Sequence, residues 1–199
     1  MDVPLFIAAL MFMIPMYITP GPNNVLCAVH GSQHGIRATI PLISGMAVGW
    51  LAMGVFVAGA LDLIERNQEI LRYLTLVGAA YIAYLAFIIA MAKPLDDQGG
   101  ESQVLGPVTG FTLQFVNGKA WIHDLVLLGS FGTVFGAGFT PKVALVILAI
   151  VLTIPAVMAW AAFGTLLRRA FSTPGSAALL NRIMGASLFA VAIWLAAYH

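Results

Sequence analysis

The sequence has few charged residues and a single cysteine. Only 9% of its 199 residues are charged, whereas 61% are hydrophobic, and a soluble domain carries about 25% charged residues. With Cys27 alone, an intramolecular disulfide is excluded. The net charge of +1 and the lack of a basic run give no sign of nucleic-acid binding. The composition therefore indicates an integral membrane protein.

The sequence also lacks the motifs of common enzyme classes. It contains no Walker-type phosphate loop, no HExxH and no GxSxG, and its four histidines are scattered. We therefore expect neither an enzyme nor a chain that drives transport with ATP on its own, and we expect no cofactor and no resident metal. Residues 1–4 lack the positive region of a signal peptide, so we expect the first apolar segment to be retained.

Six stretches are apolar and long enough to cross a bilayer, which takes about 20 residues. They span residues 4–29, 39–61, 71–92, 107–135, 142–167 and 177–198. A polar linker at 93–106 divides the chain into halves 1–92 and 107–199. Three helices per half would place the halves in opposite orientations, as in inverted-repeat transporters. We predict one all-α transmembrane domain over 1–199, with six helices in two inverted three-helix repeats, surrounded by the lipid of the cell membrane.

Lysine and arginine in short loops indicate the cytoplasmic side of a membrane protein. The odd-numbered loops hold five such residues and the even-numbered loops hold three: Arg37, Lys93, Arg168, Arg169 and Arg182 against Arg66, Arg72 and Lys142. This bias predicts odd loops in the cytoplasm and both termini outside.

A proline-rich stretch interrupts the first apolar segment. It reads Thr19, Pro20, Gly21, Pro22, Asn23 and Asn24. Prolines lack a backbone N–H and clash with the preceding turn, and glycine adds freedom, so a helix cannot continue unchanged. We predict that Thr19 caps a new helix with Pro20 in its first turn. In lipid, such a break survives only where protein or a water-filled cavity satisfies the freed backbone groups.

The new helix would present unpaired N–H groups and the positive end of its dipole, which suit a carboxylate. Asn23 and Asn24 lie in its first turn, where their amides can donate and accept hydrogen bonds. The six residues of the break are therefore predicted to bind substrate.

A second break interrupts the fourth apolar segment at Asn117, Gly118 and Lys119. Asn117 is a suitable N-cap. A helix beginning at Gly118 would place Lys119 at the positive end of its dipole, which is unfavourable without a nearby anion. Lys119 therefore either helps to bind a carboxylate or is neutralised by Asp124. One broken helix in each half is the strongest sequence indication of a midplane binding site, so we predict that these three residues also line it.

Asp124 is the sole carboxylate deep inside a predicted span, and ionisable residues within a membrane are usually functional. It is predicted either to bind the amine of a substrate or to carry a coupling proton. His123 is a second candidate for proton handling. It points about 100° away from Asp124 around a helix, so we expect that both cannot squarely face one pocket.

Gly45 and Gly49 have the small-xxx-small spacing that lets membrane helices approach closely. This seam could serve a homo-oligomer or the packing of the chain's own helices.

Together these residues resemble the lysine-exporter-type (LysE/RhtB) family of amino-acid efflux proteins. The matching positions are 19–23, Gly31, Gly35, Gly45 and Gly49, then 78–85, 111–119, Arg182 and Gly185. Three features depart from the family pattern. Gly118 replaces a proline, the pair His123–Asp124 replaces residues that are more often apolar, and the loop after the first segment has few of the usual arginines. The resemblance implies export of amino acids or related small zwitterions, driven by the proton gradient.

We therefore predict a secondary active transporter that exports amino acids or related zwitterions. One alternative is an inorganic cation carrier with Asp124 and His123 as ligands. Another is a non-transporting membrane protein in which the two breaks are only packing kinks.

Overall fold

The computed structural model describes residues 1–66, 68–91, 104–170 and 173–197, and the regular elements in these ranges are α-helices. In chain order they are α1 (Val3–Ile18), α2 (Pro22–His34), α3 (Ile36–Arg66), α4 (Gln68–Met91), α5 (Pro107–Val116), α6 (Gly118–Phe131), α7 (Phe139–Ala170) and α8 (Pro174–Ala197). Most of the predicted polar linker, residues 93–103, lies outside the described residues. The all-α prediction is confirmed for the described part of the chain.

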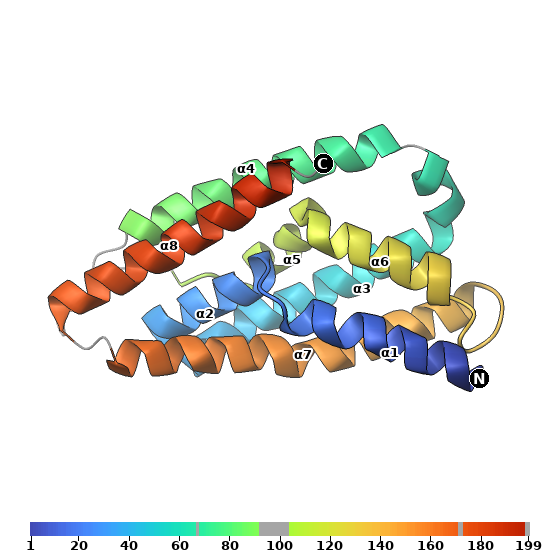
Figure 1. Cartoon of the computed structure of the whole chain (residues 1–199), viewed down its shortest axis with the longest axis horizontal. Coiled ribbons are helices and arrows are strands. Elements are labelled where there is room, and N and C mark those ends of the chain that lie inside the picture. Colours follow the sequence, from blue (N-terminus) through green and yellow to red (C-terminus); the bar gives the residue numbers. More distant parts are fainter. Residues whose placement is uncertain (67, 92–103, 171–172, 198–199) are drawn as a thin grey trace.

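The two predicted helix breaks are present. The first apolar segment forms α1 and α2, which are bent by 42° relative to each other. The fourth forms α5 and α6, which are separated at Asn117, whose backbone is extended (φ −93°, ψ 96°). The other four segments each lie in one helix, although α3 is kinked at Ala60 (φ −117°, ψ 15°). Figure 1 shows the resulting bundle.

Judged by helix length and composition, the described residues contain fewer candidate membrane spans than the six that the sequence predicts. Within the described residues, two helical stretches are long and apolar enough to cross a membrane, Ile36–Leu61 and Phe139–Ala170. A third is added if the bent pair of α1 and α2 counts as one span. The six-span arrangement therefore stays a prediction.

Helices pack in pairs from opposite halves of the chain. The most extensive contacts join α2 to α7, α3 to α5 and α4 to α8, and in Figure 1 α4 and α8 run side by side. Glycines allow all three pairs to approach closely. In the α4–α8 pair, a Cβ at Gly185 would lie 2.6 Å from Cβ of Ala90. A Cβ at Gly31 would overlap the Ala161 backbone, and one at Gly164 would overlap the Ala28 backbone.

The α3–α5 pair is packed in the same way. A Cβ at Gly45 would overlap the backbone of Pro107, and one at Gly49 would lie 2.7 Å from the carbonyl oxygen of Phe111. From α5, Gly110 faces the backbone of Leu42. The predicted glycine seam therefore packs against a helix of the same chain.

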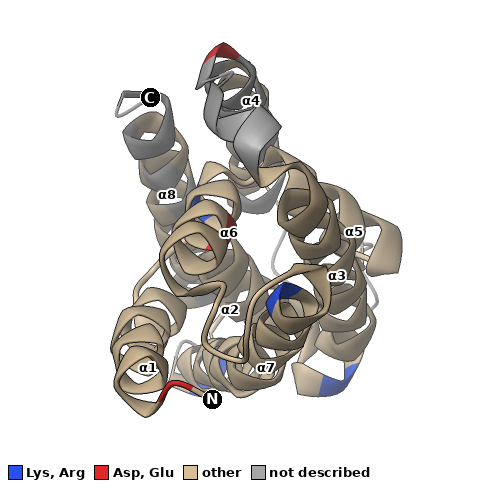
Figure 2. Ribbon diagram, turned by 90° about the vertical axis from the view of Figure 1, so that its right-hand side faces the viewer, with Lys and Arg blue, Asp and Glu red and all other residues tan. Residues whose placement is uncertain are grey.

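The buried apolar side chains form two clusters, and both helix breaks lie between them. One cluster includes residues 25–29 of α2 and Leu113 of α5. The other includes Met13 of α1 and Leu127 of α6. Each break therefore separates a helix of one cluster from a helix of the other. Polar groups gather at this boundary. In Figure 2, charged residues are few among the described parts of the ribbon, and α6 carries both signs, as Lys119 and Asp124.

Candidate functional site

The first break begins and ends at different residues from those predicted. Thr19 is the C-cap of α1, and its N–H donates to the carbonyl of Pro15. Gly21 is the N-cap of α2 and Pro22 its first residue, so the predictions that Thr19 caps the new helix and that Pro20 lies in its first turn are wrong. Pro22 suits the first helical position because its missing N–H has no intrahelical partner there.

The predicted position of the two asparagines is confirmed, since Asn23 and Asn24 lie in the first turn of α2 and are buried. The Asn24 amide caps the end of α1 from there. Its Nδ2 donates to the carbonyls of Tyr17 at 2.7 Å and Thr19 at 2.9 Å. Protein side chains therefore satisfy carbonyls that the break frees, as a break at membrane depth requires.

The second break is closed by its own N-cap, as predicted. The Asn117 side chain accepts a hydrogen bond from the backbone N–H of Lys119 at 3.2 Å, and α6 begins at the buried Gly118. The same side chain also reaches the first break, because Nδ2 of Asn117 donates to Oδ1 of Asn23 at 3.2 Å. The two breaks therefore meet.

Gln114 completes this contact, and the sequence analysis missed it. Asn23 donates to Gln114 Oε1 at 2.9 Å, and Gln114 Nε2 lies 3.3 Å from Asn23 Oδ1 and 3.0 Å from the Gly110 carbonyl oxygen. Asn23, Gln114 and Asn117 are all buried. We call these three residues the amide cluster. A polar side chain in an apolar stretch, three positions before Asn117, was the available signal for Gln114.

Lys119 extends from the start of α6 to the end of α1. Its Nζ donates to the Thr19 carbonyl at 3.1 Å and to the Thr19 hydroxyl at 3.0 Å. The carbonyl end of a helix favours a cation, so this contact offsets the unfavourable position of Lys119 in its own helix. The predicted alternative, neutralisation by Asp124, is wrong in this conformation, since the carboxylate pairs with His123.

Gly21 leaves the space through which Lys119 passes. A Cβ at this position would lie 2.9 Å from Cδ and 3.0 Å from Nζ of Lys119. The backbone of Gly21 is extended (φ −166°), a conformation that any residue adopts. The absent side chain, and not backbone freedom, is therefore what this position contributes.

His123 and Asp124 are closer than their angular separation on a helix suggested. His123 Nδ1 lies 3.0 Å from Asp124 Oδ1, and both side chains are buried. Both border a second, narrow void. Of the two, His123 alone lines the cavity described next, so the expectation that both cannot squarely face one pocket stays a prediction. The side chains turn toward each other from neighbouring positions. The His123 ring packs against Phe12 and Tyr17, with centroid distances of 5.6 and 5.2 Å.

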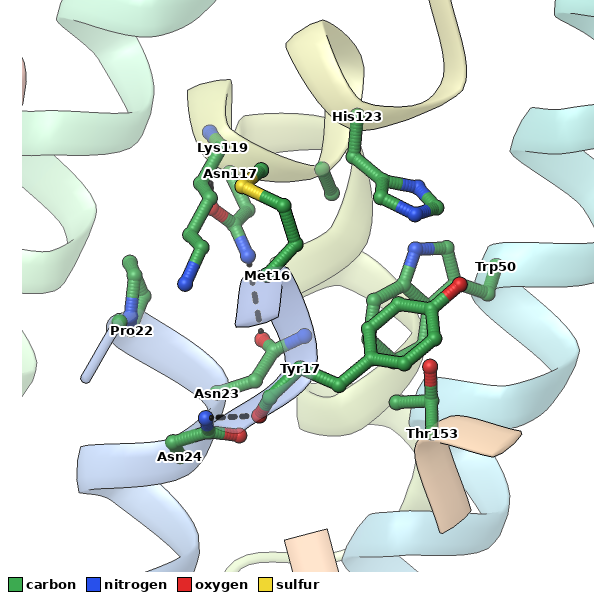
Figure 3. A pocket seen from close by; sticks show the side chains of 12 residues that line it. Met16, Tyr17, Pro22, Asn23, Asn24, Trp50, Asn117, Lys119, His123 and Thr153 are labelled. Atoms are coloured by element: carbon green, nitrogen blue, oxygen red, sulfur yellow. Dashed lines mark hydrogen bonds between the residues drawn. The ribbon is translucent and has the colours of Figure 1, made fainter. Parts of the chain in front are cut away.

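A small cavity lies where these groups converge, with a volume of about 30 Å³. Seven of its lining residues were predicted site residues: Gly21, Pro22, Asn23, Asn24, Asn117, Lys119 and His123. Five were missed: Met16, Tyr17, Trp50, Ala120 and Thr153. Figure 3 shows most of these side chains around the cavity. Of the other predicted residues, Thr19 contacts Lys119, whereas Pro20, Gly118 and Asp124 are not in the lining.

Comparison with known proteins supports the family resemblance seen in the sequence. Residues 14–199 match the family described as LysE type translocator. Cysteine/O-acetylserine efflux proteins of Salmonella choleraesuis (strain SC-B67) and Salmonella typhimurium (strain LT2) are each 34% identical over 155 residues, which covers 77% of this chain and 79% of each relative. A protein of the same description from Klebsiella pneumoniae is 35% identical over 115 residues, 57% of this chain and 58% of the relative. No solved structure matches the chain.

The match covers nearly the whole chain, and the apolar helices fit a multi-pass protein of the cell membrane. A translocator moves its substrate and is not an enzyme. The chain therefore belongs to the LysE-type translocator family.

Proposed function

We propose that this protein is a secondary active transporter that exports small amino acids, such as cysteine and O-acetylserine, and that the meeting point of the two breaks binds their carboxylate. Amino-acid export follows from the family and from relatives named as cysteine/O-acetylserine efflux proteins. This assignment takes the place of the two alternatives, a cation carrier and a non-transporting protein. Among the described residues, no group of three His, Cys, Asp or Glu side chains could hold a metal ion.

The contact between the two breaks is the observation that carries the proposal. Through the Asn117–Asn23 bond, the start of α6 is held against the start of α2. Lys119 then lies beside Gly21, the N-cap of α2. A carboxylate placed there would meet the Lys119 ammonium and the positive end of the α2 dipole together.

Lys119 keeps capacity for such a ligand. An ammonium group has three N–H donors, and the two bonds to Thr19 leave one for a carboxylate oxygen. Asn23 and Asn117 line the same cavity and can add amide contacts. Pro20 and Gly118 would act by setting the backbone of each break.

Transport requires the walls of the site to separate. A volume of about 30 Å³ holds one or two water molecules but no amino acid. The amide cluster joins the first half of the chain to the second, so we propose that it opens and re-forms as the halves rock during alternating access.

We also propose the six-span, inverted-repeat arrangement. The first segment packs on the fifth through α2 and α7, the fourth packs on the second through α5 and α3, and the third packs on the sixth. Exchanging the halves leaves this pattern unchanged, which supports a two-fold relation. The proposal includes coupling to the proton gradient, as the family resemblance implies, and the sequence has no nucleotide-binding loop for ATP-driven transport.

Flux into proteoliposomes tests the function. We expect labelled cysteine, O-acetylserine or another small amino acid to enter faster than in protein-free vesicles, and to respond to an imposed pH gradient. No flux for a broad amino-acid panel, under gradients of either direction, would contradict the proposed function. Flux that ignores the gradient would contradict only the coupling.

A further inference from the structure

A second, narrow void lies beside the cavity and is bordered by the His123–Asp124 pair. Its remaining lining residues are Tyr17, Trp50, Val146, Ala149, Ile150 and Thr153. Four residues border both spaces: Tyr17, Trp50, His123 and Thr153. The void, which is too narrow for a water molecule, therefore adjoins the cavity on the side of Asp124.

Polar atoms without hydrogen-bond partners surround this void. They are Oδ2 of Asp124, Nε2 of His123 and Nε1 of Trp50. The hydroxyl of Tyr17 lies in the same region, beside Thr153 (Figure 3). Asp124, His123 and Tyr17 are 2%, 3% and 6% exposed. Buried polar atoms are almost always paired, because leaving them unpaired is costly. The indole N–H of Trp50 can only donate, whereas Asp124 Oδ2 and His123 Nε2 can accept, so a ligand with N–H donors could pair with these two atoms.

The charge and geometry of these atoms indicate which kind of ligand group they suit. A carboxyl oxygen of Asp124 can accept hydrogen bonds, and among the described residues the basic side chain beside it is that of His123, whose Nδ1 lies 3.0 Å from Oδ1. The nearest lysine of the cavity is already bound to Thr19. His123 Nε2 accepts when Nδ1 holds the proton, and the Tyr17 hydroxyl can also accept. A positively charged N–H donor would satisfy these acceptors, and the aromatic ring of Tyr17 would favour it further.

We propose that Asp124, with His123 and Tyr17, binds the ammonium group of the transported amino acid. This inference rests on the proposed function, which places the carboxylate at Lys119. Figure 3 shows Lys119 on one side of the cavity and His123, Tyr17 and Trp50 on the other. A zwitterion lies between them with each charge facing its opposite, and the movement that admits it joins the cavity to the void.

Two isomeric probes test this assignment. O-acetylserine and N-acetylserine have the same atoms, but only the first keeps a free ammonium group. Each is used to inhibit labelled cysteine flux in proteoliposomes, in mildly acidic buffer where the acetyl group stays on oxygen. We expect wild-type protein to prefer O-acetylserine by at least about tenfold, the effect of one charged hydrogen bond. In Asp124→Asn this preference falls to less than about threefold.

Tyr17→Phe is the second variant, because it removes one hydroxyl and leaves the packing in place. It should reduce the same preference several-fold with an unchanged melting temperature, and it keeps the test decisive if Asp124→Asn fails to fold. If both variants keep the wild-type preference for O-acetylserine, this inference is overturned but the proposed function is not. A variant that changes only the pH dependence of flux also overturns this inference, since that assigns the pair to proton handling. Absence of wild-type cysteine flux contradicts the proposed substrate and this inference with it.

Discussion

Asn117 donates a 3.2 Å hydrogen bond to Asn23, across 94 positions of sequence, and so joins the two helix breaks. Each asparagine also makes a second hydrogen bond. Asn117 caps α6, and Asn23 lies in the first turn of α2 and bonds to Gln114. The contact joins two breaks that differ in position, since the first comes late in the segment 4–29 and the second comes earlier in the segment 107–135.

Replacing Asn117 separates its two roles. Asn117→Ser keeps an N-cap oxygen, but its shorter side chain cannot reach Asn23. Asn117→Ala loses both, and losing an N-cap costs about 1 kcal/mol. We expect both variants to lower transport and Asn117→Ala to have the lower melting temperature in detergent. Wild-type flux in both variants would show that the contact between the breaks is not needed for transport.

Gly21→Ala should impair transport without unfolding the protein. The new methyl group would lie 2.9 Å from Cδ and 3.0 Å from Nζ of Lys119, so this side chain would have to shift. The protein should stay folded, because the end of a lysine side chain can move at little cost. Gly106→Ala is the matched control, because Gly106 is the N-cap of α5, is followed by a proline, and has no neighbour within 4 Å. Initial flux rates should fall for the first variant and stay near wild type for the second. Equal rates would refute the role given to Gly21.

Gly110→Ala should destabilise the bundle. Its Cβ would overlap the Leu42 backbone and lie 2.8 Å from the Met46 nitrogen, so α3 and α5 would have to separate. Overpacking of this kind costs about 1–3 kcal/mol, and we expect a melting temperature several degrees lower. Gly59→Ala, whose nearest contact would be Phe139 at 3.7 Å, should melt like wild type. A Gly110→Ala protein as stable as the control would show that this close approach is unimportant.

The sequence predicted those parts of the site that local chemistry determines. The prolines and glycine around Pro20 end a helix by their own geometry, and Asn117 caps one with its own side chain. The exact start of α2 was missed because Thr19 and Gly21 are both acceptable N-caps, and each is followed by a proline that suits the first helical position.

Contacts between distant segments were harder to predict. Tyr17 and Trp50 reach the cavity, and Gln114 reaches Asn23, only because α1, α3 and α5 pack around α2 and α6, which no local pattern encodes. The partner of Lys119 was missed for the same reason, since the end of α1 comes 100 positions earlier. The His123–Asp124 contact depends on side-chain rotamers that helical periodicity does not specify.

Lys119→Met tests the central claim, that Lys119 binds the substrate carboxylate. Methionine keeps much of the length but removes the charge, and the Thr19 carbonyl retains its bond from Asn24. We measure counterflow of labelled cysteine in proteoliposomes, with Lys142→Met on α7 as the control. Losing a charged hydrogen bond should reduce flux at subsaturating cysteine by about 10-fold or more, with the melting temperature unchanged and the control near wild type. Flux in Lys119→Met equal to that of the Lys142→Met control would contradict the account.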